Sequence, residues 1–323
     1  MFQLKLVPEK TGVPFVKWRN PAMACSAALV VLSFILAFTP GLNFGIDFRG
    51  GILIEVQTEG PANLRDMRSN LGSLGLGEVS LQEFGSADTV LIRIEKQPGD
   101  AAAQQVAVSK VRAALGDGVD YRRTEFVGPK VSGELIEAGA IAIALAVVLM
   151  LIYIWFRFEW HFGVGAVVAL VHDVALSVGL FAATQMEFNL STIAALLTIV
   201  GYSINDTVVV YDRVRENLRK YKTKSLPDVL NLAINDTLSR TTMTSVTTLL
   251  ALFVLFAFGG AVIQGFVFAM IWGVIIGTYS SIFIAAPLLI VLGLGDRHRS
   301  GQTGSGLAGG GQNQDADAAK STS

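Results

Sequence analysis

The sequence of 323 residues contains one cysteine, Cys25, and three histidines. A single cysteine excludes a disulfide within the chain and any zinc or iron–sulfur site built from several cysteines. The three histidines, His161, His172 and His298, leave little material for a histidine-rich metal site. We therefore expect no metal and no organic cofactor.

Common enzyme signatures are also missing. The sequence has no H-E-x-x-H and no P-loop, and the run Gly201-Tyr202-Ser203-Ile204-Asn205 fails the G-x-S-x-G pattern. Without a P-loop, nucleotide hydrolysis within this chain is not expected to supply energy. We predict that the protein is not an enzyme.

Charged residues are scarce, at 16% of the chain, against about 25% in an average globular protein. The 25 Lys and Arg residues nearly balance 26 Asp and Glu residues, which leaves a net charge of -1. This balance argues against a nucleic-acid partner, because such proteins usually carry a basic surface. Hydrophobic residues make up 52% of the chain, which indicates a membrane protein in contact with the lipid bilayer.

The uncharged runs locate the membrane-spanning segments. Residues 20–46 carry no charge, and residues 241–295 carry none either. A helix needs about 20 apolar residues to cross roughly 30 Å of hydrocarbon, so the second run is long enough for two crossings joined at Gly259-Gly260. The pattern predicts six transmembrane helices, at about 21–40, 136–156, 162–184, 189–211, 239–258 and 263–292.

Orientation follows from the Lys and Arg residues of the short loops. They gather in the N-terminal segment, at Arg157, in the segment 212–238 and at the start of the C-terminal tail. All four places fall on one side of the predicted topology, so both termini are expected in the cytoplasm. The first apolar run could instead be a cleaved signal peptide, but its length and the lack of an A-x-A-like site favour an uncleaved anchor.

These features divide the chain into five parts. The residues between the first two helices are polar and Gly-punctuated, as in a soluble domain outside the cytoplasm, and the Gly-rich tail cannot bury apolar surface and should be disordered. The predicted parts are a cytoplasmic segment 1–20, helix 21–40, the extracytoplasmic domain 41–135, a five-helix bundle 136–293 with a cytoplasmic loop 212–238, and a disordered tail 294–323.

The extracytoplasmic domain has a β-α-β-β-α-β pattern, which is typical of a ferredoxin-like fold. A turn around residues 86–88 joins its two middle strands, and the domain shows no evident catalytic set. In the loop 212–238, Ser225 and Asp228 resemble a capping box for a second amphipathic helix. The elements expected in the domain are strands 51–57, 78–84, 89–95 and 119–127 and helices 61–74 and 101–115.

Two acidic residues lie inside apolar runs, where an ionised Asp costs at least about 2.5–3.5 kcal/mol at mid-bilayer. Asp206 precedes the exposed Asp212 by six residues, which places it about 9 Å inside the cytoplasmic boundary. Asp173 lies near the midplane, beside His172. A membrane protein retains such residues where something depends on them.

Asp206 has a candidate partner in Arg240, at the start of the fifth helix and at a similar depth. Ser203 and Asn205 lie close to Asp206 in sequence, and Thr244 follows Arg240 by four residues on one helix face. If the distance between acid and base changes with conformation, the proton affinity of Asp206 changes with it, which is the minimum for a proton relay. The alternative is a static ion pair that locks the bundle.

His172 and Asp173 form a second, weaker candidate for a proton-transfer site. Such a pair on a transmembrane helix can shuttle protons, but it can equally hold helices together. We keep both interpretations open.

Several blocks of the sequence occur together in one known family. They are Gly-Ile-Asp-Phe-Arg-Gly-Gly (45–51), Val-Gly-Pro-Lys-Val-Ser (127–132), Val-His-Asp-Val (171–174), Gly-Tyr-Ser-Ile-Asn-Asp-Thr (201–207), Tyr-Asp-Arg-Val-Arg-Glu-Asn (211–217) and Leu-Ser-Arg-Thr (238–241). In these blocks the sequence resembles the SecF family of protein-export membrane proteins. The first block, with Asp47, Gly50 and Gly51, resembles the family signature that opens the first periplasmic domain. The resemblance covers about residues 15–293 and leaves out the Gly-rich tail.

This resemblance implies half of an RND-type twelve-helix bundle, which requires SecD as a partner. It also implies work with the SecYEG channel, often with YajC, on a preprotein substrate in the bacterial inner membrane. Protons are the implied coupling ion, with Asp206 and Arg240 in the proton pathway.

Three hypotheses follow. The first is a subunit of a proton-driven protein-export motor. The second is a small-molecule or lipid exporter of the same superfamily. The third is a structural scaffold, in which Asp206 and Arg240 would tolerate joint neutral replacement.

Overall fold

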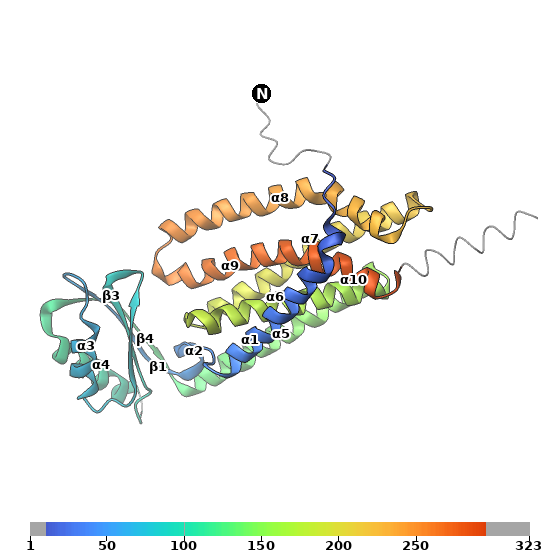
Figure 1. Cartoon of the computed structure of the whole chain (residues 1–323). Coiled ribbons are helices and arrows are strands. Elements are labelled where there is room, and N and C mark those ends of the chain that lie inside the picture. The colour runs from blue at the N-terminus through green and yellow to red at the C-terminus, as the bar shows by residue number, and fades with distance from the viewer. Residues whose placement is uncertain (1–10, 100, 295–323) are drawn as a thin grey trace, which may run out of the picture.

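A computed structural model describes residues 11–99 and 101–294 of the chain. Long helices lie side by side in a bundle, and a small β-sheet domain lies at one end of it (Figure 1). Most of the predicted disordered tail and the first ten residues of the N-terminal segment lie outside the described residues.

Six helical segments of the described chain are long and apolar enough to cross a membrane. The chain is therefore a multi-pass membrane protein, as predicted. The segments are α1 (Arg19–Phe38), extended at its start by the short helix η1 (Phe15–Trp18), α5 (Pro129–Arg157), α6 (Trp160–Thr184), α7 (Leu190–Lys220), α8 (Leu226–Phe258) and α9 (Ala261–Ser280), which continues through the π-helical turn η3 (Ser281–Ala285) into α10 (Ala286–Val291).

The segment 212–238, which we predicted as a cytoplasmic loop containing a second amphipathic helix, is mostly helical. Helix α7 runs to Lys220, so only residues 221–225 connect it to α8. The expected second amphipathic helix is the first part of α8 and not a separate element. The Ser225 hydroxyl accepts a hydrogen bond from the Asp228 N–H, and Pro227 in the first turn costs no helical hydrogen bond.

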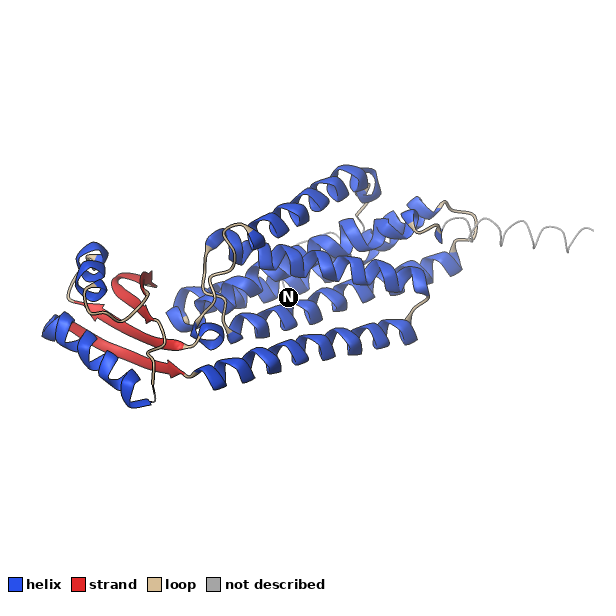
Figure 2. Ribbon diagram, turned by 90° about the horizontal axis from the view of Figure 1, so that it is seen from below, coloured by secondary structure: helices blue, strands red, loops and turns tan. Residues whose placement is uncertain are grey.

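The sheet domain has four antiparallel strands in the spatial order β2-β3-β1-β4. Two helices cover one face of the sheet and bury its apolar side chains there (Figure 2). The β-α-β-β-α-β sequence of elements is as predicted. The elements are β1 (Gly51–Thr58), α3 (Leu64–Gly72), β2 (Val79–Phe84), β3 (Ser86–Ile94), α4 (Ala101–Leu115), the short helix η2 (Gly116–Gly118) and β4 (Val119–Val127), with the short helix α2 (Ile46–Arg49) before β1.

The turn predicted around residues 86–88 is wrong by two residues. The chain reverses at Gly85, whose φ of +77° is easily adopted by glycine, and Phe84 pairs directly with Ser86. Strand β3 therefore begins at Ser86.

Close packing within the bundle brings α9 against α7. A Cβ atom on Gly273 would lie 2.2 Å from Cγ1 of Ile199, so only glycine permits this approach. A Cβ on Gly277, one turn later, would lie 3.2 Å from Cβ of Ser203. The end of α9 and the turn η3 are thus held beside the polar part of α7.

Candidate functional site

Asp206 is buried where α7, α8 and η3 meet, with 8% of its surface exposed. Its Oδ1 accepts a hydrogen bond from Thr241 Oγ1 at 2.7 Å, and its Oδ2 accepts one from Ser281 Oγ at 2.6 Å. Two hydroxyl groups thus replace part of the hydration that a carboxylate loses on leaving water. Sequence reasoning had not singled out Thr241 or Ser281.

The predicted pairing of Asp206 with Arg240 is absent from the described part of the single chain. Arg240 is exposed, and its guanidinium acts on the carboxylate only through space. Thr244 is exposed beside it and donates to the Arg240 carbonyl at 2.9 Å. Asn205 is also exposed, because adjacent residues of a helix point in directions about 100° apart.

Asp173 on α6 is fully buried and has more hydrogen-bond partners than Asp206. His172 Nδ1 lies 2.8 Å from its Oδ1, and the hydroxyls of Ser203 and Ser280 donate to its Oδ2 at 2.5 and 2.7 Å. Ser203 was expected near Asp206, but it faces α6 instead. The His172 ring is stacked on Tyr279, with 6.1 Å between the ring centroids.

The two acids are linked by adjacent residues, because Ser280 donates to Asp173 and Ser281 donates to Asp206. Both serines have no exposed surface. They lie where α9 passes into the π-helical turn, a rare geometry that is frequent at functional sites. The signal in the sequence was four consecutive hydroxyl-bearing residues, Thr278-Tyr279-Ser280-Ser281, within an uncharged and largely apolar run.

A second cluster of contacts joins the sheet domain to the bundle. Asp47 on α2 accepts a hydrogen bond from the Leu190 N–H at the start of α7. Arg93 on β3 forms an ion pair with Glu187 at 3.1 Å and donates to Asn43 at 3.0 Å. We call these five residues the junction.

The glycines of the Asp47 block are required by backbone geometry. Gly50 and Gly51 have φ angles of +69° and +121°, which side-chain-bearing residues rarely adopt. A Cβ on Gly51 would lie 2.5 Å from the Ile94 carbonyl oxygen.

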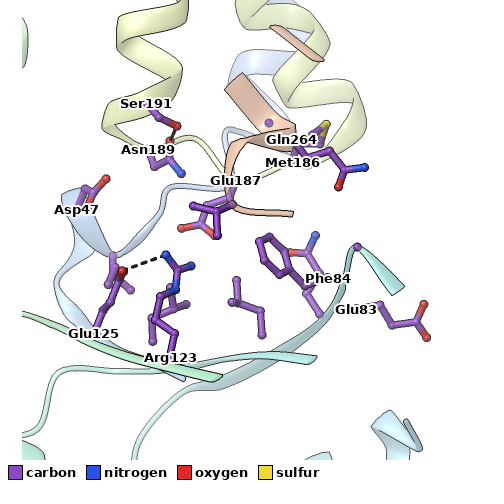
Figure 3. Close-up of a pocket in the computed structure, with 17 residues that line it drawn as sticks. Asp47, Glu83, Phe84, Arg123, Glu125, Met186, Glu187, Asn189, Ser191 and Gln264 are labelled. Atoms are coloured by element: carbon purple, nitrogen blue, oxygen red, sulfur yellow. Dashed lines mark hydrogen bonds and ion pairs between the residues drawn. The ribbon is translucent and has the colours of Figure 1, made fainter. Parts of the chain in front are cut away.

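A cavity of about 300 Å³ lies beside the junction, between the sheet and the ends of the bundle helices. Figure 3 shows Arg123 paired with Glu125 along the sheet, and Glu187 and Phe84 among the side chains that line the cavity. Apolar side chains such as Leu53 and Leu91 form its floor. In the part of the chain that the structure describes, no group of three His, Cys, Asp or Glu residues could hold a metal ion.

Two family models match the chain. The model of the protein export membrane protein SecD/SecF, C-terminal, matches residues 107–295, which include both buried acids. The SecD/SecF GG motif matches residues 35–62, which include Asp47, Gly50 and Gly51.

The chain belongs to the SecD/SecF family.

Its similarity to members of the SecD/SecF family extends over most of its length. It is 47% identical over 291 residues to the protein translocase subunit SecF of Rickettsia rickettsii, covering 90% of this chain and 94% of that protein. It is 49% identical over 313 residues to the subunit SecF of Rhodobacter capsulatus, covering 92% and 94%.

The fold is similar to crystal structures of SecDF, a larger member of the family. The SecDF of Thermus thermophilus, described as a translocon-associated membrane protein, matches with a TM-score of 0.81 and 33% identity. A SecDF in a super-membrane-facing form matches with a TM-score of 0.63 and 32% identity. The chain spans 40% and 41% of those two chains, respectively.

Proposed function

We propose that the chain uses the proton-motive force to promote the export of preproteins, as an accessory subunit of the Sec translocase. Family membership makes it an accessory subunit and does not favour the alternative of a small-molecule exporter. The observation that carries the proton-coupled role is the Asp206 carboxylate, which is buried among hydroxyl groups within a membrane-spanning helix.

Gain and loss of a proton would change what Asp206 can do. As a carboxylate it only accepts hydrogen bonds, and the hydroxyls of Thr241 and Ser281 both donate to it. Once protonated, one of its oxygens becomes a donor. The hydroxyl that faces this oxygen must then point its own proton to another acceptor. An approach of the Arg240 guanidinium favours the ionised form, so helix movement and protonation are linked.

A SecD-type partner would complete the site. Asn205, Arg240 and Thr244 are exposed on a single chain, although they lie within or at the end of membrane-spanning segments. Polar side chains at such depth are expected to face protein or water and not lipid. The match to SecDF, in which this chain spans 40% of the whole, supports pairing with SecD.

The remaining features of the proposal come from the family and from charge distribution. The chain lies in the bacterial cytoplasmic membrane with both termini in the cytoplasm, because its basic loops share that side. It acts with the SecYEG channel, in many cells with YajC, on an emerging preprotein. Protons are the coupling ion, and no other cofactor takes part.

The test is Asp206→Asn in vesicles that contain the chain, a SecD-type partner and the SecYEG channel. Export stimulated by a proton gradient should fall to the level without the gradient, while assembly with the partner is unchanged. Asp212→Asn is the matched control, because Asp212 lies on the same helix but is half-exposed and paired with Arg157 at 2.6 Å. A structural scaffold predicts instead that Asp206→Asn combined with Arg240→Gln retains full stimulation.

A further inference from the structure

Ser280 and Ser281 each have two acceptors for one hydroxyl proton. Ser280 Oγ lies 2.7 Å from Oδ2 of Asp173 and 3.2 Å from the Gly277 carbonyl oxygen. Ser281 Oγ lies 2.6 Å from Oδ2 of Asp206 and 2.9 Å from the Thr278 carbonyl oxygen. A hydroxyl donates one proton, so each serine chooses between a carboxylate on another helix and a carbonyl of its own helix.

The two serines are consecutive in the chain, at the point where α9 passes into the π-helical turn η3. Ser280 is the last residue of α9 and Ser281 the first of the π-helical turn, so the two carboxylates bond consecutive residues, and a rotation of the backbone at the start of this turn moves both hydroxyls together. Two carboxylates on different helices therefore hold one turn in a rare geometry from two sides.

We propose that Asp173 is a second proton-binding acid, coupled to Asp206 through Ser280 and Ser281. This inference rests on the proposed function, because it takes Asp206 as a site of protonation. When Asp206 takes up a proton, it no longer holds the Ser281 hydroxyl proton, the start of the turn rotates away from Asp206, and Ser280 moves with it away from Asp173. Asp173 then keeps fewer donors and binds a proton more readily.

Other titratable groups around Asp173 are few. His172 on its own helix is 2.8 Å away, and Tyr279 on α9 is stacked on that histidine and bonded to Ser26 of α1. Helix α7 contributes Ser203, besides Asp206 itself. Helix α1 carries no charge after Arg19.

The sign of the coupling separates this proposal from simple charge repulsion. Two carboxylates that interact only by Coulomb's law bind protons in opposition, because neutralising one stabilises the charge of the other. Coupling through the serines makes the two acids bind protons together. By linkage, the effect is reciprocal.

The experiment is an infrared titration of protonated carboxyl groups in the full chain assembled with its SecD-type partner in lipid nanodiscs. Asp173→Asn and Asp206→Asn assign the two bands. Ser280→Ala removes no charge and no contact with Asp206, yet it should tighten proton binding at Asp206 by at least about fivefold. Ser281→Ala should do the same at Asp173.

Ser177→Ala is the matched control. Ser177 is buried on α6 and donates to the backbone carbonyl of Asp173 at 2.8 Å and not to its carboxylate, so both midpoints should stay in place. Thermal unfolding of each variant confirms that it is folded.

The coupling is overturned if Ser280→Ala leaves the Asp206 midpoint unchanged, or if Asp173 shows no protonated band at any pH that keeps the complex folded. An unchanged titration midpoint of Asp173 in Ser281→Ala overturns the coupling as well. If Asp173 titrates and Asp206 does not, the proposed function fails. If neither acid titrates, both proposals are wrong.

Discussion

Asp47 accepts a hydrogen bond from the backbone N–H of Leu190, with 2.9 Å between Oδ2 and N. Leu190 is the first residue of α7, and the first turn of a helix has N–H groups without partners within the helix. The carboxylate satisfies one of them and interacts favourably with the positive end of the helix dipole. The block that opens the sheet domain is thereby fixed to the helix that carries Asp206.

Replacing Asp47 should weaken this attachment. We expect Asp47→Ala to lower the free energy of unfolding by about 1 kcal/mol, as for other helix-capping residues. Asp47→Asn should cost less, because an amide oxygen can still accept the hydrogen bond. Thermal unfolding of the purified chain measures both, and equal stability of the Ala variant and the natural protein would contradict the capping role.

The ion pair between Arg93 and Glu187 should also contribute to the junction. Their side chains are only 14% and 19% exposed, so the pair is less screened than a surface pair. A double-mutant cycle with Arg93→Met and Glu187→Gln should give a coupling of about 1–2 kcal/mol. The exposed pair between Arg122 and Asp120 is the control and should give less than about 0.5 kcal/mol. Equal coupling in the two cycles would show that burial adds nothing at the junction.

Gly51 should not tolerate a side chain. Gly51→Ala must adopt a φ near +121° and place Cβ against the Ile94 carbonyl, which should cost about 1–3 kcal/mol. Gly60→Ala is the control, because nothing lies within 4 Å of a Cβ built there. Chemical denaturation of the two variants tests the difference, and a similar small loss in both would refute it.

The exposed β2–β3 hairpin makes a pH-dependent contribution to the stability of the fold. The Ser86 hydroxyl, followed by the Gln57 amide, lowers the pKa of Asp88 by donating to its carboxylate. A carboxyl with a lowered pKa stabilises the fold above its unfolded value of about 3.9 and loses that contribution as the pH falls through the folded value. The difference in melting temperature between the natural protein and Asp88→Asn should therefore shrink below about pH 4. A difference that stays constant with pH would exclude this cause.

The sequence predicted the membrane spans well because the cost of inserting charge is visible in composition. The uncharged runs 20–46 and 241–295 needed no tertiary information. The sequence did not predict that α8 is continuous from Leu226. We divided the amphipathic helix from the membrane-spanning helix where the charged residues end, although no residue in between breaks a helix.

The contacts of the buried acids could not be predicted, because they depend on how each helix is rotated against its neighbours. Ser203 and Asp206 are three residues apart on α7, yet Ser203 bonds Asp173 while Asp206 bonds Thr241. The π-helical turn that presents Ser281 likewise has no signature in residue type.

Proton movement through the assembled complex tests the central claim most directly. Vesicles containing the chain and its SecD-type partner are given an inward proton gradient, and internal acidification is followed with a pH-sensitive dye. We predict proton entry that is abolished by Asp206→Asn and retained by Asp212→Asn. Proton entry at the same rate in Asp206→Asn would contradict the account.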